Sequence, residues 1–111
     1  MASSVNGGFL QKASTAISDG ISLSLVSASR ASIMIFGTST VFTVKFLVSL
    51  DGINFVPIEG VKIGDSSVAA NTTSTNSEGW NFPDVAAWSH LRTQISAIEN
   101  GNVSILANAI A

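Results

Sequence analysis

The segment TVFTVKFLVS, residues 40–49, decides the fold class. Large apolar residues occupy alternate positions of this segment: Phe42, Val44, Phe46 and Val48. A period of two is typical of a β-strand, because successive side chains point to opposite faces of a sheet. The other face also carries apolar residues, Val41 and Leu47, so we predict a central strand.

The same alternation recurs along the chain, and no stretch of ten or more residues has the apolar spacing of a helix. The further alternating positions are Ile21, Leu23 and Leu25, then Ile33 and Ile35, then Leu91, Thr93, Ile95 and Ala97, and finally Val103, Ile105, Ala107 and Ala109. Between the strands, Asp51-Gly52 and Asn100-Gly101 predict tight hairpin turns. We therefore predict an all-β fold, an antiparallel β-sandwich of about eight short strands, either jelly-roll or immunoglobulin-like.

Three segments between these strands are read separately. Phe55 to Ile58 contains Pro57, which predicts an edge strand because proline cannot donate a ladder hydrogen bond. Residues 61–68 predict another short strand. The polar stretch 71–79 fits either a loop or a Thr-rich edge strand, and both readings stay open.

The length and the termini predict the domain organisation. A chain of 111 residues suits one sandwich domain, which we place at residues 9–111. Residues 1–8, from Met1 to Gly8, are predicted to form a flexible N-terminal arm with no secretory signal pattern. No apolar run reaches the roughly 18 residues of a membrane-spanning helix, so we expect no membrane partner.

Composition indicates the kind of partner. The chain is 46% hydrophobic and 11% charged, with a mean hydropathy of +0.45. Such a composition is unfavourable for an isolated monomer, so we predict a homo-oligomer, with a trimer favoured. The formal net charge of -2 provides no basic face for phosphates, so nucleic acid is not an expected partner.

The residues that catalysis requires are scarce. The chain has one histidine, no cysteine and no tyrosine, and its seven carboxylates are scattered. We predict that it is not an enzyme and that it has no catalytic residues, no cofactor and no metal site. One alternative stays open, a calcium ion bound by Asp51 or Asp65 together with loop carbonyls.

One aromatic cluster could bind a ligand. Trp88, His90 and Arg92 are spaced by two and share a face if the segment is extended, and Trp80 precedes them closely. Such a group could stack on a sugar ring, so a glycan is a possible ligand. The favoured interpretation places these residues in the core or in a subunit interface.

The hairpin pattern resembles that of small virion structural proteins of tailed bacteriophages. The matching segments are Phe46-Leu47-Val48-Ser49-Leu50-Asp51-Gly52-Ile53-Asn54-Phe55-Val56-Pro57-Ile58, Gly79-Trp80-Asn81-Phe82, Leu91-Arg92-Thr93-Gln94-Ile95-Ser96-Ala97 and Gly101-Asn102-Val103-Ser104-Ile105. The resemblance implies a β-sandwich that decorates or cements a capsid, or forms part of a tail or fibre, usually as a homo-oligomer. It implies no catalytic residues.

We therefore expect a capsid decoration or cement protein that binds the outer shell as a homo-oligomer and stabilises it. Its expected partners are the major capsid protein or other virion proteins, and its expected location is the virion, after synthesis in the host cytoplasm. The expected contact elements are the arm at 1–8, the polar stretch 71–78 and the apolar end 107–111. The alternatives are a tail, baseplate or fibre module, and a carbohydrate-binding β-sandwich.

Overall fold

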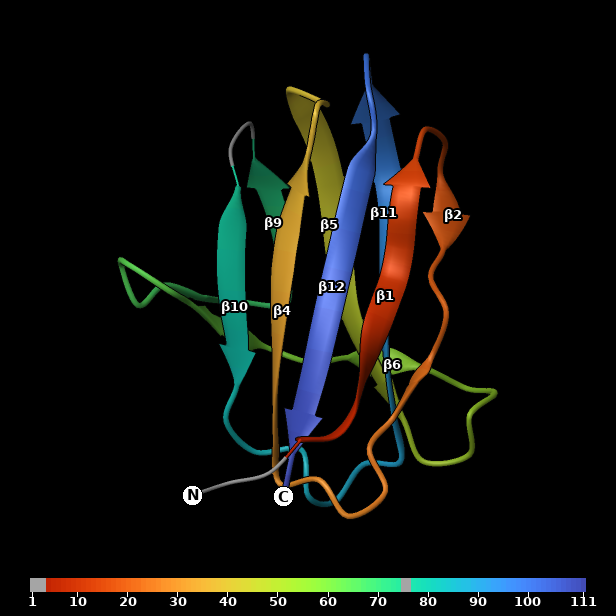
Figure 1. Cartoon of the computed structure of the whole chain (residues 1–111), viewed down its shortest axis with the longest axis vertical. Coiled ribbons are helices and arrows are strands. Elements are labelled where there is room, and N and C mark those ends of the chain that lie inside the picture. Colours follow the sequence, from red (N-terminus) through yellow and green to blue (C-terminus); the bar gives the residue numbers. More distant parts are fainter. Residues whose placement is uncertain (1–3, 75–76) are drawn as a thin grey trace.

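The computed structural model describes residues 4–74 and 77–111, and these residues form two antiparallel sheets packed face to face (Figure 1). The strands are β1 (Ser4–Ser14), β2 (Ser18–Asp19), β3 (Leu23–Ser24), β4 (Arg30–Gly37), β5 (Val41–Ser49), β6 (Val56–Pro57), β7 (Gly60–Lys62), β8 (Val68–Ala69), β9 (Asn71–Ser74), β10 (Glu78–Phe82), β11 (His90–Glu99) and β12 (Val103–Ile110). The predicted antiparallel β-sandwich is confirmed. The described part has more strands than expected because it includes four strands of only two residues, β2, β3, β6 and β8.

Each layer contains strands that are distant in the sequence. The first layer, sheet A, has the order β1-β12-β4-β10-β7-β8. The second layer, sheet B, has the order β2-β11-β5-β6, with β3 also paired to β11 and β9 also paired to β5. No helix among the described residues is long and apolar enough to cross a membrane.

The core lies between the sheets and follows the alternation of β5. Its residues Phe42, Val44, Phe46 and Val48 are all buried, as predicted. The ring of Phe46 contacts two aromatic residues of β10 in the opposite sheet, Trp80 at a centroid distance of 4.9 Å and Phe82 at 5.3 Å. Contacts of this kind join the two sheets through their aromatic side chains.

Both predicted turn signals coincide with turns, but one turn is longer than expected. Asn100 (φ 47°) and Gly101 (φ 111°) both adopt positive φ between β11 and β12, as a tight hairpin requires. Gly52 also has positive φ (77°), but it lies within a loop of six residues, 50–55, that joins β5 to β6. The prediction of a tight hairpin at Asp51-Gly52 is therefore wrong, because additional residues fold over the sheet.

The N-terminal strand and two other segments also differ from the predictions. Strand β1 begins at Ser4 and pairs with β12 along its length. Residues 4–8, which were predicted as part of a flexible arm over 1–8, therefore belong to a strand. Residues 1–3 of that predicted arm lie outside the described residues. Pairing of this kind uses backbone groups and does not require apolar side chains. Residues 61–68 contain a turn between β7 and β8, with positive φ at Gly64 and Ser66. Of the polar stretch 71–79, Asn71–Ser74 is the edge strand β9.

Candidate functional site

A row of apolar residues crosses the outer face of sheet A. The strand register places Phe9 of β1 beside Leu106 of β12, Leu106 beside Met34 of β4, and Met34 beside Gly79 of β10. Ile63 continues the row, because its backbone N–H donates to the carbonyl of Gly79 at 2.9 Å. Phe9, Met34 and Ile63 are 39%, 48% and 59% exposed, so the row meets solvent.

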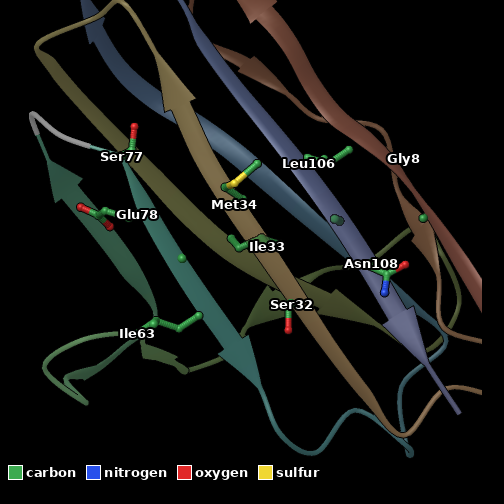
Figure 2. Close-up of a pocket in the computed structure, with 12 residues that line it drawn as sticks. Gly8, Ser32, Ile33, Met34, Ile63, Ser77, Glu78, Leu106 and Asn108 are labelled. Carbon is green, nitrogen blue, oxygen red and sulfur yellow. The ribbon is translucent and has the colours of Figure 1, made fainter. Parts of the chain in front are cut away.

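This row borders a hollow of about 780 Å³ (Figure 2). Figure 2 shows the side chains of Met34 from β4, Leu106 from β12 and Ile63 from the turn after β7 around it. Gly7, Gly8 and Gly79 also line the hollow and contribute no side chains to it. The lining is therefore mainly apolar, which suits the side chains of a protein partner.

A polar row lies next to the apolar one. Ser32 of β4 faces Asn81 of β10 on one side and Asn108 of β12 on the other. The Ser32 hydroxyl donates to Oδ1 of Asn81 at 2.7 Å. A partner seated on the apolar row would therefore find hydrogen-bonding groups at its edge.

The predicted aromatic platform is not assembled as expected. Trp80 is 2% exposed and lies in the core, so it cannot present a ring face to a glycan. Trp88 precedes β11, packs against the core and is half-buried, so it does not continue the strand face of His90 and Arg92. Of the four predicted residues, only His90 and Arg92 share a face, the outer face of sheet B. The physical reason is that large apolar indoles favour burial in or against the core, whereas the polar side chains of His90 and Arg92 stay on the outer face.

His90 and Arg92 instead hold the loop at 50–55. The guanidinium carbon of Arg92 lies 3.9 Å from the centroid of the Phe55 ring, a stacked cation–π contact. Nε of Arg92 is buried and has no hydrogen-bond partner among the described residues, which leaves the ring as its main support. The His90 ring lies against Gly52, where an added Cβ would come within 3.0 Å of Cε1.

The carboxylate of Asp51 fixes the same loop from within. Its Oδ1 accepts hydrogen bonds from the backbone N–H groups of Ile53 and Asn54, both at 2.8 Å, and from the Ser49 hydroxyl at 2.9 Å. These bonds, with the Asn54 backbone contact foremost, hold the pKa of Asp51 well below its ordinary value of 3.8. The ordered loop presents Leu50 (68% exposed) and Ile53 (80% exposed) to solvent.

The two aspartates considered for calcium both cap turns. Oδ1 of Asp65 accepts a bond from the backbone N–H of Ser67 at 2.9 Å, and this bond is the main cause of its lowered pKa. No group of three or more His, Cys, Asp or Glu side chains with metal-binding geometry is found among residues 4–74 and 77–111.

Replacing Asp51 by alanine is expected to loosen the loop at 50–55 without unfolding the sandwich. The backbone amides of Ile53 and Asn54 lose their acceptor, so their hydrogen exchange, followed by NMR, should quicken several-fold. In the wild type, the pKa of the Asp51 carboxyl is lower in the folded protein than its ordinary value of 3.8. The ionised carboxylate therefore stabilises the loop fully above pH 3.8, and this stabilisation is lost as the pH falls toward the lowered pKa. Protection of the two amides should therefore weaken as the pH falls below about 4.

Asp84→Ala provides the control, because Asp84 is also exposed and lies in a different loop. Equal amide protection in wild type and Asp51→Ala would show that the carboxylate does not order the loop.

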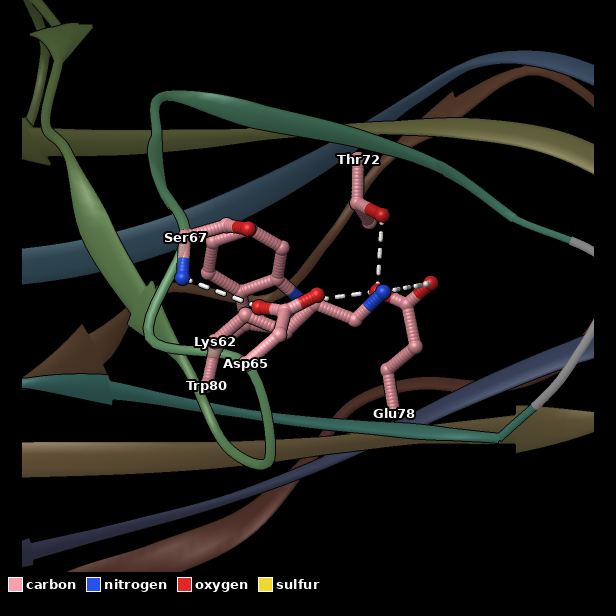
Figure 3. A network of polar contacts seen from close by, with 6 residues as sticks. All are labelled: Lys62, Asp65, Ser67, Thr72, Glu78 and Trp80. Atoms are coloured by element: carbon pink, nitrogen blue, oxygen red, sulfur yellow. Dashed lines mark hydrogen bonds and ion pairs between the residues drawn. The ribbon is translucent and has the colours of Figure 1, made fainter.

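A buried polar cluster ties β9 to β10 (Figure 3). Oε1 of Glu78 accepts bonds from the Thr72 hydroxyl and from Nε1 of Trp80, both at 2.7 Å. Nζ of Lys62 lies 3.8 Å from Oε2 of the same carboxylate, whose side chain is 2% exposed. The cluster joins sheet A to sheet B, so its role is structural.

The fold and these surfaces define a non-helical sandwich module with an apolar hollow on sheet A and an apolar loop beside sheet B. The family model named XepA matches residues 5–109, so the chain belongs to the XepA family. No curated protein sequence shows significant similarity to the chain.

Two solved structures share the fold. One is the SPBc2 prophage-derived protein YomS, with a TM-score of 0.91 at 20% identity; the match covers 100% of this chain and 96% of YomS. The other is the PBSX exported protein XepA, with a TM-score of 0.89 at 25% identity. That match covers 95% of this chain and 37% of the other, so the chain spans little more than a third of the PBSX protein. Together with the family, these relatives support the predicted association with phages.

Parts of these surfaces could be predicted from the order of residues along the chain. The expected contact segment 107–111 lies mostly in β12, between β1 and β4, with Ala107 and Ala109 buried. The side chains of these two alanines point inward because successive residues of a strand face opposite sides of the sheet. The same alternation, which places Ile33 and Ile35 inside, indicates that Met34 points outward. Prediction of the hollow also requires the strand order, which periodicity alone does not supply.

Proposed function

We propose that the protein is a phage structural component that works by assembly and not by catalysis. In this proposal it binds the outer capsid shell as a homo-oligomer, as a decoration or cement protein, with the major capsid protein or other virion proteins as partners. It requires no cofactor, and its location is the virion after synthesis in the host cytoplasm. The description of YomS as prophage-derived supports the phage origin.

The observation that carries the proposal is the apolar row on sheet A. Met34 and Ile63 are 48% and 59% exposed on an ordered sheet and border a hollow of about 780 Å³. Apolar side chains that lie next to one another on an ordered sheet are a common feature of surfaces that a protein partner covers. A protein surface fits this mainly apolar, open hollow better than a polar ligand does.

The proposed mechanism is mechanical. A standard interface buries about 800 Å² on each partner, roughly one seventh of the 5763 Å² surface of this chain. Each subunit alone would bind the shell modestly. A symmetric oligomer binds several equivalent sites at once, so modest contacts combine into attachment that rarely reverses.

Sedimentation with undecorated capsids tests the proposal. We expect the wild type to pellet with capsids and Met34→Glu to weaken capsid binding by at least about tenfold, because a charge in the apolar row disfavours the contact between subunits on which multivalent attachment depends. Val41→Glu is the matched control, since Val41 is 44% exposed on the outer face of sheet B. Circular dichroism should show that both variants remain folded.

Wild-type protein that stays wholly in the supernatant would contradict the capsid role. Immunogold labelling of whole particles then distinguishes a tail, baseplate or fibre location from absence in the virion.

A further inference from the structure

We propose that the apolar loop of one copy, carrying Leu50 and Ile53, inserts into the hollow on sheet A of a second copy. This inference rests on the proposed homo-oligomer and names the two surfaces that would form it. It commits the hollow to one occupant, another molecule of the same chain.

The loop at 50–55 has the properties of an inserting element. Leu50 and Ile53 are 68% and 80% exposed, and large apolar side chains in water favour burial. The loop is fixed by the hydrogen bonds of Asp51, and Phe55 is stacked on Arg92. A loop ordered before binding loses little conformational entropy on binding, so more of the burial energy contributes to affinity.

The hollow has the properties of a receptor for such side chains. Its walls include Met34, Leu106 and Ile63, which are apolar. At Gly8 nothing lies within 4 Å of the position a Cβ would occupy, so the space beside β1 is open. Glu78 also borders the hollow, but its side chain is 2% exposed and belongs to the buried cluster. Branched aliphatic side chains can enter without placing an unpaired charge in an apolar site.

Charge on the two surfaces is complementary. Lys12 lies on the hollow side of sheet A, with Nζ 5.6 Å from the centroid of the Phe9 ring, and it forms no ion pair within residues 4–74 and 77–111. The loop carries Asp51 directly after Leu50, and the hydrogen bonds to its carboxylate favour the charged form. A loop seated in the hollow brings Asp51 to the face of sheet A that carries Lys12, which favours this orientation over a hollow-to-hollow contact.

The positions of the two surfaces determine the type of assembly. The hollow lies on the outer face of sheet A, whereas the loop joins β5 to β6 of sheet B (Figure 1). Two different patches in contact make a heterologous, head-to-tail interface, which closes into a ring or continues as an open chain.

A complementation experiment tests this interface. Ile53→Glu removes the loop surface and Met34→Glu removes the hollow, so each variant alone should be monomeric by light scattering, with self-association weakened at least about tenfold. Mixed in equal amounts, they should form a heterodimer, because the intact loop of Met34→Glu fits the intact hollow of Ile53→Glu. The variant with both substitutions should bind neither the loop nor the hollow of the wild-type protein. Ile17→Glu and Val41→Glu, at residues 67% and 44% exposed, should leave the wild-type assembly unchanged.

A mixture that stays monomeric overturns the inference. If Met34→Glu dissociates the oligomer but Ile53→Glu does not, the inference is also overturned. That result would instead indicate a two-fold contact between the hollows of two copies. Wild-type protein that is monomeric in solution yet pellets with capsids overturns this interface while leaving the capsid role intact.

Discussion

Replacing Glu78 by alanine is expected to lower the free energy of unfolding by about 3 kcal/mol, which is a large part of the stability of a small domain. The carboxylate accepts two hydrogen bonds at 2.7 Å, from Thr72 and from the indole of Trp80. Without it, both donors remain in the protein interior with no acceptor, and an unsatisfied buried donor costs about 1–3 kcal/mol.

The ion pair adds little to this expectation. The Nζ atom of Lys62 lies 3.8 Å from the carboxylate, but its side chain is 33% exposed, so water screens the attraction. Loss of Glu78 lets Lys62 turn toward solvent at small cost. The effect should therefore come from the hydrogen bonds that connect the two sheets.

Chemical denaturation followed by circular dichroism measures the change. Glu78→Gln keeps an acceptor oxygen for both donors and should lose less stability than the alanine variant. Glu59→Ala, at an exposed carboxylate, should change the free energy of unfolding by less than about 0.5 kcal/mol. A loss below about 1 kcal/mol in Glu78→Ala would mean that the cluster does not hold the sheets together.

Most of the fold could be predicted because alternation along one strand is a local property of the sequence. The inward positions of β5, β11 and β12 follow from alternate residues alone. The first part of strand β1, residues 4–8, could not be predicted this way, since its Gly7 and Gly8 have low strand propensity and are extended because β12 pairs with them.

The hollow and the buried polar cluster were harder to predict because they depend on neighbours from distant parts of the chain. The hollow requires β1, β12, β4 and β10 to lie side by side, and periodicity does not determine strand order. A local signal for the buried cluster was present, because Glu78 is two residues from Trp80 and so shares its inward face. Composition alone predicts that a glutamate lies at the surface, because glutamate is rarely buried without partners. The hydrogen bonds that compensate for the burial of Glu78 become visible only in the three-dimensional structure.

Replacing Phe46 by alanine is expected to cost about 3–5 kcal/mol of unfolding free energy, enough to unfold a marginally stable domain. Phe46 is fully buried at the centre of β5. Its ring is tilted against Trp80 and meets Phe82 edge-on, with an interplanar angle of 81°. Truncation leaves a cavity and removes two aromatic pairs, each worth about 0.5–1.5 kcal/mol beyond the burial of area.

Thermal and denaturant unfolding of three variants separates packing from hydrophobicity at this position. Phe46→Leu keeps most of the buried volume and should lose less stability than the alanine variant, whereas Phe9→Ala, at a residue 39% exposed, should lose about 1 kcal/mol or less. Because Phe46 and Glu78 both contact Trp80, the double variant Phe46→Ala with Glu78→Ala should lose less than the sum of the single losses. Strict additivity would mean that Trp80 does not couple the aromatic contact with the polar cluster.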